Sequence, residues 1–89
     1  MAERNIEVIN RLGLHARASA RLTQLASTYR SEVWITRNGR RVNGKSIMGV
    51  MMLAAGQGSL VRVETLGEDA EIALNAIDTL FRNRFGEDA

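Results

Sequence analysis

His15 is the only histidine of the 89-residue chain, and it lies in a glycine-flanked turn directly before a segment with helical periodicity. The first N–H groups of a helix have no partner within the helix, and the helix dipole favours an anion beside them. Neutral imidazole is a nucleophile near pH 7, and Arg17 can donate hydrogen bonds to phosphate oxygens. This spacing suits a site that carries a phosphoryl group on His15. A lone histidine is nevertheless more often structural or simply exposed, so these residues do not decide the question alone.

Other kinds of site fit the sequence less well. One histidine and no cysteine supply too few ligands for zinc, and no nucleophile elbow marks a Ser-His-Asp hydrolase. The stretch 39–46 matches the P-loop pattern, but Gly39 is explained by a hairpin, and a nucleotide-binding fold needs a longer chain with a parallel sheet. Three acidic residues are interpreted as first-turn helix charges and not as a catalytic pair: Glu68, Asp69 and Glu71. We expect no metal and no cofactor.

Ser46 precedes an apolar segment, 47–55, which predicts a short helix with Ser46 as its N-cap. A cap is the ordinary role of such a serine, although a phosphate there is also electrostatically tolerated. The segment is apolar all round, so one face enters the core and the other is exposed or covered by a partner. Met48 and Met51 suit a docking patch, because methionine adapts to several partners. Two further residues are interpreted mainly as core: Ile47 and Leu53.

The side of the predicted first helix nearest His15 is polar. Arg17, Arg21 and Gln24 stand at helical spacing on this side. Such residues are by default solvated. Their alignment with the only candidate nucleophile instead predicts a rim that contacts a partner.

The hydrophobic pattern switches between strand and helix periodicity along the chain. Alternation predicts strands at 4–9, 33–35, 40–42 and 60–66. Asn38-Gly39 is a strong hairpin signal between the second and third strands. Helical periodicity predicts helices at 16–28, at 47–55, and from 67–69 to Gly86. The order β-α-β-β-α-β-α predicts a two-layer α+β fold with helices on one face of the sheet.

Length and composition point to one domain, 1–89. The absence of cysteine fits a cytoplasmic protein, the polar N-terminus lacks a signal peptide, and the longest apolar run is too short for the roughly 20 residues of a membrane span. Residues 1–45 carry nine Arg and Lys against three acids, whereas 46–89 carry three Arg against seven acids. The arginine-rich half predicts attraction to an acidic partner, with nucleic acid as the alternative.

Two motifs carry a resemblance to a known family. Gly13-Leu14-His15-Ala16-Arg17 resembles the active-site motif of HPr, the histidine-containing phosphocarrier family of the phosphoenolpyruvate-dependent sugar phosphotransferase system. Lys45-Ser46-Ile47-Met48-Gly49-Val50 resembles that family's second signature, around its regulatory serine. Length, element order and both motif positions agree from end to end. Two motifs at the expected separation are more specific than either alone.

The resemblance implies an open-faced β-sandwich, in which three helices cover one face of a four-stranded antiparallel sheet. It implies that enzyme I, which draws on phosphoenolpyruvate, phosphorylates His15 on Nδ1 and that a IIA protein or domain then receives the group. Arg17 would stabilise the phosphohistidine. Ser46 would be the target of the ATP-dependent HPr kinase/phosphorylase, and phosphoserine there would hinder docking to enzyme I. The implied partner surface comprises Ala20, Arg21, Gln24, Ile47, Met48 and Met51.

The carrier implied by the resemblance is a cytoplasmic monomer and a stoichiometric intermediate, not a turnover enzyme. A transcriptional regulator is a further implied partner, and insertion into a membrane is not expected. One residue departs from the family, which usually has proline where this chain has Ala18. Proline fixes φ in the first helical turn and removes an N–H. We expect phosphotransfer to survive this change with a slightly less ordered loop.

Two alternatives from other classes remain open. One is a regulatory binding protein that acts through phosphorylated Ser46 and the methionine patch, with little carrier activity. The other is a small basic nucleic-acid-binding domain. Only Trp34 and Tyr29 are available there to stack on bases. No recognition motif supports this second alternative, so nucleic acid is not an expected partner.

Overall fold

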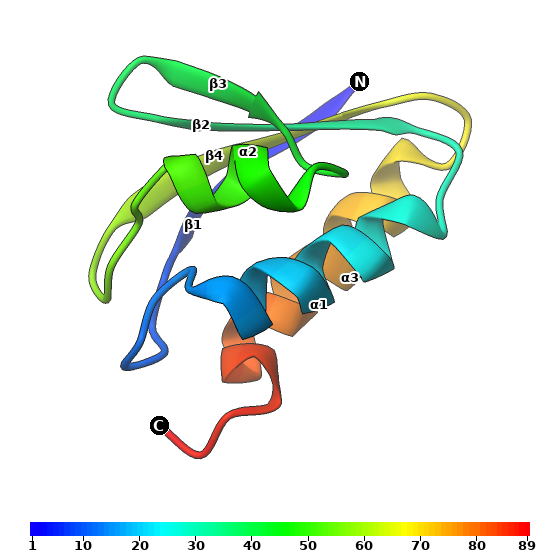
Figure 1. The fold of residues 1–89 in the computed structure, drawn as a ribbon. Helices are drawn as coiled ribbons and strands as arrows, with labels where there is room; N and C mark the ends of the chain where they lie inside the picture. Colours follow the sequence, from blue (N-terminus) through cyan, green and yellow to red (C-terminus); the bar gives the residue numbers. More distant parts are fainter.

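The computed structural model describes the whole chain, residues 1–89, as one sheet and one layer of helices (Figure 1). The strands are β1 (Ala2–Glu7), β2 (Glu32–Arg37), β3 (Arg40–Asn43) and β4 (Leu60–Leu66). The helices are α1 (Ala16–Ser27), α2 (Ile47–Met52) and α3 (Ala70–Arg82), followed by the 3-10 turn η1 (Arg84–Gly86). The predicted element order is confirmed. The strands lie in the order β1-β4-β2-β3, and every neighbouring pair is antiparallel.

Alternation of apolar and polar residues places one face of each long strand in the core. In β4, Val61, Val63 and Thr65 are buried on one face, and Val63 lies opposite Ile35 of β2. The hairpin between β2 and β3 turns at Asn38 and Gly39, whose φ angles are 50° and 80°. These positive angles fit the twist of the two strands, which explains why this dipeptide predicted the turn correctly.

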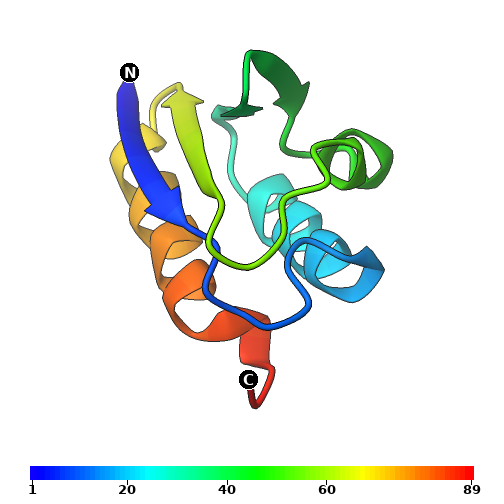
Figure 2. The same ribbon diagram turned by 90° about the vertical axis from the view of Figure 1, so that its left-hand side faces the viewer.

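The helices cover only one face of the sheet, so the predicted open-faced sandwich is confirmed. Helices α1 and α3 run beneath the strands, and α2 lies beside them near β3 (Figures 1 and 2). The largest side chains of the core come from both layers: Phe81, Phe85, Leu22, Ile35, Leu74 and Ile77. No helix is long and apolar enough to cross a membrane.

Helix α2 is shorter than predicted: it ends at Met52 and not at Ala55. Ala54 adopts a left-handed φ of 51°, which ends the helical path. Two arginines of the β2–β3 hairpin satisfy carbonyls at this end of the helix. Arg37 donates to the Leu53 carbonyl and Arg40 to the Met52 carbonyl, each at 3.0 Å. The end of α2 is therefore set by a neighbouring hairpin, which periodicity does not report.

The prediction that the last helix continues to Gly86 is wrong. Helix α3 ends at Arg82, and the next turn contains Arg84 and Phe85 at φ angles of 54° and 55°. Phe85 is 1% exposed and meets the Phe81 ring edge-on at 4.9 Å between centroids. Burial of this ring offsets the cost of a left-handed backbone in residues that carry a Cβ. The turn sends the C-terminal tail across to the start of α1 (Figure 1).

The side chain of Asp69, predicted as a first-turn helix charge, makes no hydrogen bond to its own helix. Its carboxylate accepts hydrogen bonds from the backbone N–H groups of Arg30 and Ser31, both at 2.9 Å, and from the Ser31 hydroxyl. The Ser31 hydroxyl, followed by the Arg30 N–H, holds the pKa of Asp69 below its ordinary value. Asp69 thus fastens the loop after α1 to the start of α3.

Candidate functional site

His15 occupies the N-cap of α1 with an extended backbone (φ −76°, ψ −175°). Its carbonyl accepts the first helical hydrogen bond, from Ser19 N–H at 2.8 Å. No side chain caps the helix, so the N–H groups of the first turn, from Ala16 to Ala18, remain without an acceptor. This arrangement confirms the predicted helix start and leaves an anion-binding end beside the imidazole.

Gly13 allows the loop before His15 to pass close to the segment that follows α2. Its φ is +66°, and an added Cβ would lie 2.5 Å from the Ala55 carbonyl oxygen. The neighbouring Leu14 N–H donates to the same carbonyl at 2.8 Å, and the Leu14 side chain is buried. Only glycine combines this backbone conformation with this close approach. The loop therefore holds His15 at a fixed position above α1.

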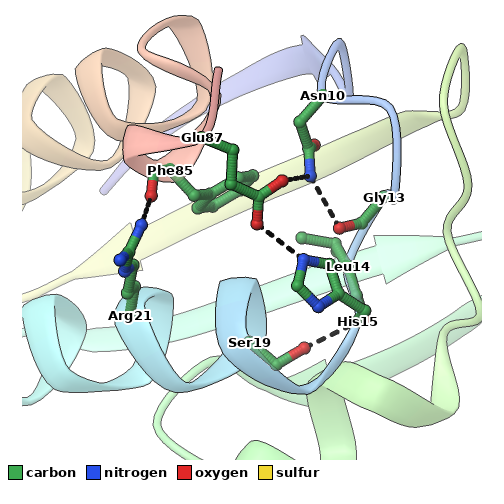
Figure 3. Close-up of polar contacts among 8 residues, drawn as sticks. All are labelled: Asn10, Gly13, Leu14, His15, Ser19, Arg21, Phe85 and Glu87. Atoms are coloured by element: carbon green, nitrogen blue, oxygen red, sulfur yellow. Dashed lines mark hydrogen bonds and ion pairs between the residues drawn. The ribbon is translucent and has the colours of Figure 1, made fainter. Parts of the chain in front are cut away.

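The His15 ring is held by a residue from the far end of the chain (Figure 3). Its Nε2 lies 2.6 Å from Oε2 of Glu87, and the two side chains are 29% and 13% exposed. The other carboxylate oxygen of Glu87 accepts from Nδ2 of Asn10 at 3.0 Å. The same amide nitrogen donates to the Gly13 carbonyl at 2.8 Å. Asn10, which is fully buried, therefore connects the loop before His15 to the C-terminal tail.

The tail that carries Glu87 is fastened on both sides of this residue. The guanidinium of Arg21 donates to the Phe85 carbonyl, and the Arg11 N–H donates to the Ala89 carbonyl oxygen at 3.1 Å. Phe85 anchors the turn in the core. Arg21, predicted as a partner contact, thus also holds the protein's own C-terminus.

The pKa of Glu87 is lower than usual. Burial acts to raise it, but hydrogen bonds from Asn10 and His15 outweigh that effect, and electrostatic interaction with His15 and Arg21 adds to the lowering. Glu87 is therefore a carboxylate at neutral pH. Its stabilising contribution is present above the ordinary glutamate pKa and is lost as pH falls through the lowered value.

Beside the contact between His15 and Glu87 lies an open hollow of about 620 Å³. Eight residues line it: Arg11, Leu12, His15, Ala16, Arg17, Glu87, Asp88 and Ala89. Arg17 is exposed, and its guanidinium makes no hydrogen bond or ion pair within the protein. The structure thus brings His15 and Arg17 together, with the arginine free to bind an anion.

The predicted partner surface lies on α1 and α2, which are in contact. Ile47, Met48 and Met51 are 45%, 70% and 39% exposed. The interpretation of Ile47 as a core residue is therefore wrong, whereas Leu53 is buried as predicted. Only Val50 of α2 enters the core. On α1, Arg21 and Gln24 are exposed and Ala20 is half-buried.

The exposed apolar surface near the site also includes residues that the sequence did not single out. Leu12 is 66% exposed in the loop before His15, and Met52 is 58% exposed at the end of α2. Ser46 caps α2 as predicted, since its hydroxyl oxygen accepts from the Gly49 N–H at 3.1 Å. Its side chain is half-buried.

Sequence reasoning missed Asn10 and Glu87. Glu87 contacts His15 across 72 residues of chain and Asn10 across 77, so no local spacing links Glu87 to the histidine. The one available signal was Asn10 itself, a polar residue that directly follows the strand-like pattern and precedes the glycine turn.

Comparison with known proteins agrees with this geometry. The family described as "PTS HPr component phosphorylation site" matches residues 2–83. The phosphocarrier protein HPr of Cupriavidus necator is 60% identical, over 98% of both chains. The structure of HPr-C-His from Thermoanaerobacter tengcongensis is 42% identical and superposes over all of both chains with a TM-score of 0.96. An HPr dimer from the same organism covers 98% of this chain and all of that one, with 42% identity and a TM-score of 0.79. The chain therefore belongs to the HPr family of phosphocarrier proteins.

Proposed function

We propose that His15 accepts a phosphoryl group from phosphorylated enzyme I, which draws it from phosphoenolpyruvate, and passes it to a IIA protein or domain. The observation that carries this proposal is the position of the imidazole at an uncapped helix N-terminus with the unpaired Arg17 beside it. A ring nitrogen supplies the electron pair for the new P–N bond. The first-turn N–H groups of α1 and the Arg17 guanidinium then bind the phosphoryl oxygens.

The proposed carrier is a stoichiometric intermediate and not a turnover enzyme. It works by presenting one face to successive partners, and that face contains the exposed apolar residues of α2 next to the polar face of α1. Its arginines suit acidic partners. We place the carrier in the cytoplasm as a monomer, because a single exposed site serves each partner in turn. The related dimer makes the oligomeric state a useful measurement.

Regulation at Ser46 forms a second part of the proposal. HPr kinase/phosphorylase would phosphorylate the hydroxyl that now caps α2. The added charge of about −2 would lie beside Ile47 and Met48 and make an apolar contact there unfavourable. Phosphoserine would therefore weaken docking of enzyme I. The same surface would also serve a transcriptional regulator.

The test is incubation with enzyme I from the same organism and phosphoenolpyruvate, followed by intact mass measurement. We expect one acid-labile phosphate on the wild-type chain and none on His15→Ala. Arg17→Ala is expected to slow transfer by about tenfold or more, because a charge-assisted contact to phosphate is lost. A folded wild-type protein that takes up no phosphate would refute the carrier function. That result would favour the regulatory binding protein, with little carrier activity.

A further inference from the structure

We infer that Glu87 is a positioning residue, which holds the proton of His15 on Nε2 and so leaves Nδ1 as the nucleophile. This inference rests on the proposed function and adds a residue from outside the sequence motif. It starts from the close contact of the His15 ring with Glu87, in which 2.6 Å separates Nε2 from Oε2. A carboxylate only accepts hydrogen bonds, so the ring nitrogen that faces it must donate.

The second ring nitrogen points away from the carboxylate (Figure 3). Nδ1 has no hydrogen-bond partner in the protein. In the neutral ring, a proton on Nε2 leaves the lone pair on Nδ1. The carboxylate contact therefore selects the tautomer as well as the orientation of the ring.

Asn10 fixes which oxygen of Glu87 faces the histidine. Its Nδ2 donates both to Oε1 of Glu87 and to the Gly13 carbonyl, at 3.0 and 2.8 Å. A flipped Asn10 amide would lose both bonds, because its oxygen cannot donate. The atom of residue 87 that faces Asn10 must consequently accept a hydrogen bond. In Glu87 this atom is Oε1, so Oε2 is left for His15.

The chemistry of transfer uses this arrangement without moving a proton. The Nδ1 lone pair forms the P–N bond while the bond between phosphorus and the donor breaks, and that electron pair leaves with the donor. The proton stays on Nε2, so the ring becomes positively charged as the bond forms. The Glu87 carboxylate stabilises this charge, as a carboxylate does for a histidine base in hydrolases.

The substitution Glu87→Gln tests the inference because it changes hydrogen bonding without changing shape. With Asn10 donating to the amide oxygen, the NH₂ group takes the place of Oε2 and donates to Nε2. The ring must then carry its proton on Nδ1, which removes the nucleophile. Glu87→Ala neither accepts nor donates and should leave a mixture of tautomers. The matched control is Glu71→Gln, an exposed glutamate in the first turn of α3.

The first readout is the ¹⁵N NMR spectrum of the ring at a pH where it is neutral. The chain has one histidine, so the signals have one source. We expect Nε2–H in the wild type and in Glu71→Gln, a mixture in Glu87→Ala, and Nδ1–H in Glu87→Gln. The second readout is the rate of transfer from phosphorylated enzyme I. It should fall in the order wild type, Glu87→Ala, Glu87→Gln, by about tenfold or more for the last.

A purely structural role for Glu87 would not produce this order, because glutamine fits better than alanine. An Nδ1–H ring in the wild type, an Nε2–H ring in Glu87→Gln, or equal transfer rates would each overturn the inference. Slow transfer without a change of tautomer would also overturn it. An Nε2–H wild type that takes up no phosphate would refute the proposed function itself, and with it the role of Glu87 in positioning the nucleophile.

Discussion

Substitution of Gly13 by alanine tests how firmly the loop before His15 is held. Gly13 has a φ of +66°, and a Cβ there would lie 2.5 Å from the Ala55 carbonyl oxygen and 2.8 Å from Gly56 Cα. Gly39 provides the matched control, since its φ is +80° but an added Cβ would meet nothing within 4 Å. Both variants adopt a strained backbone, and only the first also collides with backbone atoms.

The magnitudes separate these two effects. A left-handed backbone costs a residue with a Cβ roughly 1–2 kcal/mol. Loss of glycine freedom in the unfolded chain offsets about 0.4–1 kcal/mol of that cost, so Gly39→Ala should lower the free energy of unfolding by about 1 kcal/mol. Overpacking against rigid neighbours costs a further 1–3 kcal/mol, approximately. Gly13→Ala should therefore be destabilised by about 2–4 kcal/mol in total.

Urea unfolding followed by circular dichroism measures both variants, and the single Trp34 gives an independent fluorescence signal. A domain of this length has a stability of roughly 5–10 kcal/mol, so a loss of 2–4 kcal/mol shifts the midpoint clearly. Equal stability of the two variants within about 0.5 kcal/mol would show that backbone conformation is the whole cost. The close packing of the loop on Ala55 would then be refuted.

Three further predictions concern other parts of the molecule. Because the pKa of Asp69 is lowered, its ionised form stabilises the fold above the unfolded value of about 3.9, and this contribution is lost as pH falls further. In urea unfolding, Asp69→Asn should have a lower free energy of unfolding than the wild type at pH 7, and the two values should converge in acid. A difference in stability that does not change with pH would contradict this. Met48 is 70% exposed, so Met48→Glu should weaken binding of enzyme I by about tenfold in calorimetry while the thermal midpoint stays unchanged. The Ala18 N–H has no acceptor, so Ala18→Pro should change the free energy of unfolding by less than about 1 kcal/mol and phosphotransfer by less than tenfold. A larger change would show that the missing proline alters the site.

The sequence predicted the fold well wherever the relevant interactions are local. The strand at 60–66 and the hairpin at Asn38-Gly39 follow from alternation and turn chemistry, and both are confirmed. The start of α1 at Ala16 is confirmed as well. The predicted ends of α2 and α3 were wrong because tertiary contacts end these helices. Arginines from the β2–β3 hairpin bind the last carbonyls of α2, and Phe85 is buried after α3.

In the candidate site too, the sequence predicted what depends on local interactions and missed what depends on tertiary contacts. His15, Arg17 and the Ser46 cap were predicted, because each depends on spacing to a nearby helix start. Ile47 was interpreted mainly as core because apolar residues are usually buried, and its exposure shows that this interpretation is wrong. The family resemblance, by contrast, placed Ile47 on the partner surface. Helix α2 is too short to bury more than one of its residues, Val50.

The contribution of Glu87 depends on a conformation that no motif in the sequence encodes. The tail reaches His15 only because Arg84 and Phe85 adopt left-handed backbone angles, and they do so because the Phe85 ring fills the core beside Phe81. A motif search finds the nucleophile but not the group that fixes its proton. If Glu87 acts as inferred, a core phenylalanine at the end of α3 controls the chemistry of His15 through the path of the backbone. Weaker packing of Phe85 would then loosen the tail that carries Glu87. The His15 ring would no longer be held with its proton on Nε2, although the motif itself is unchanged.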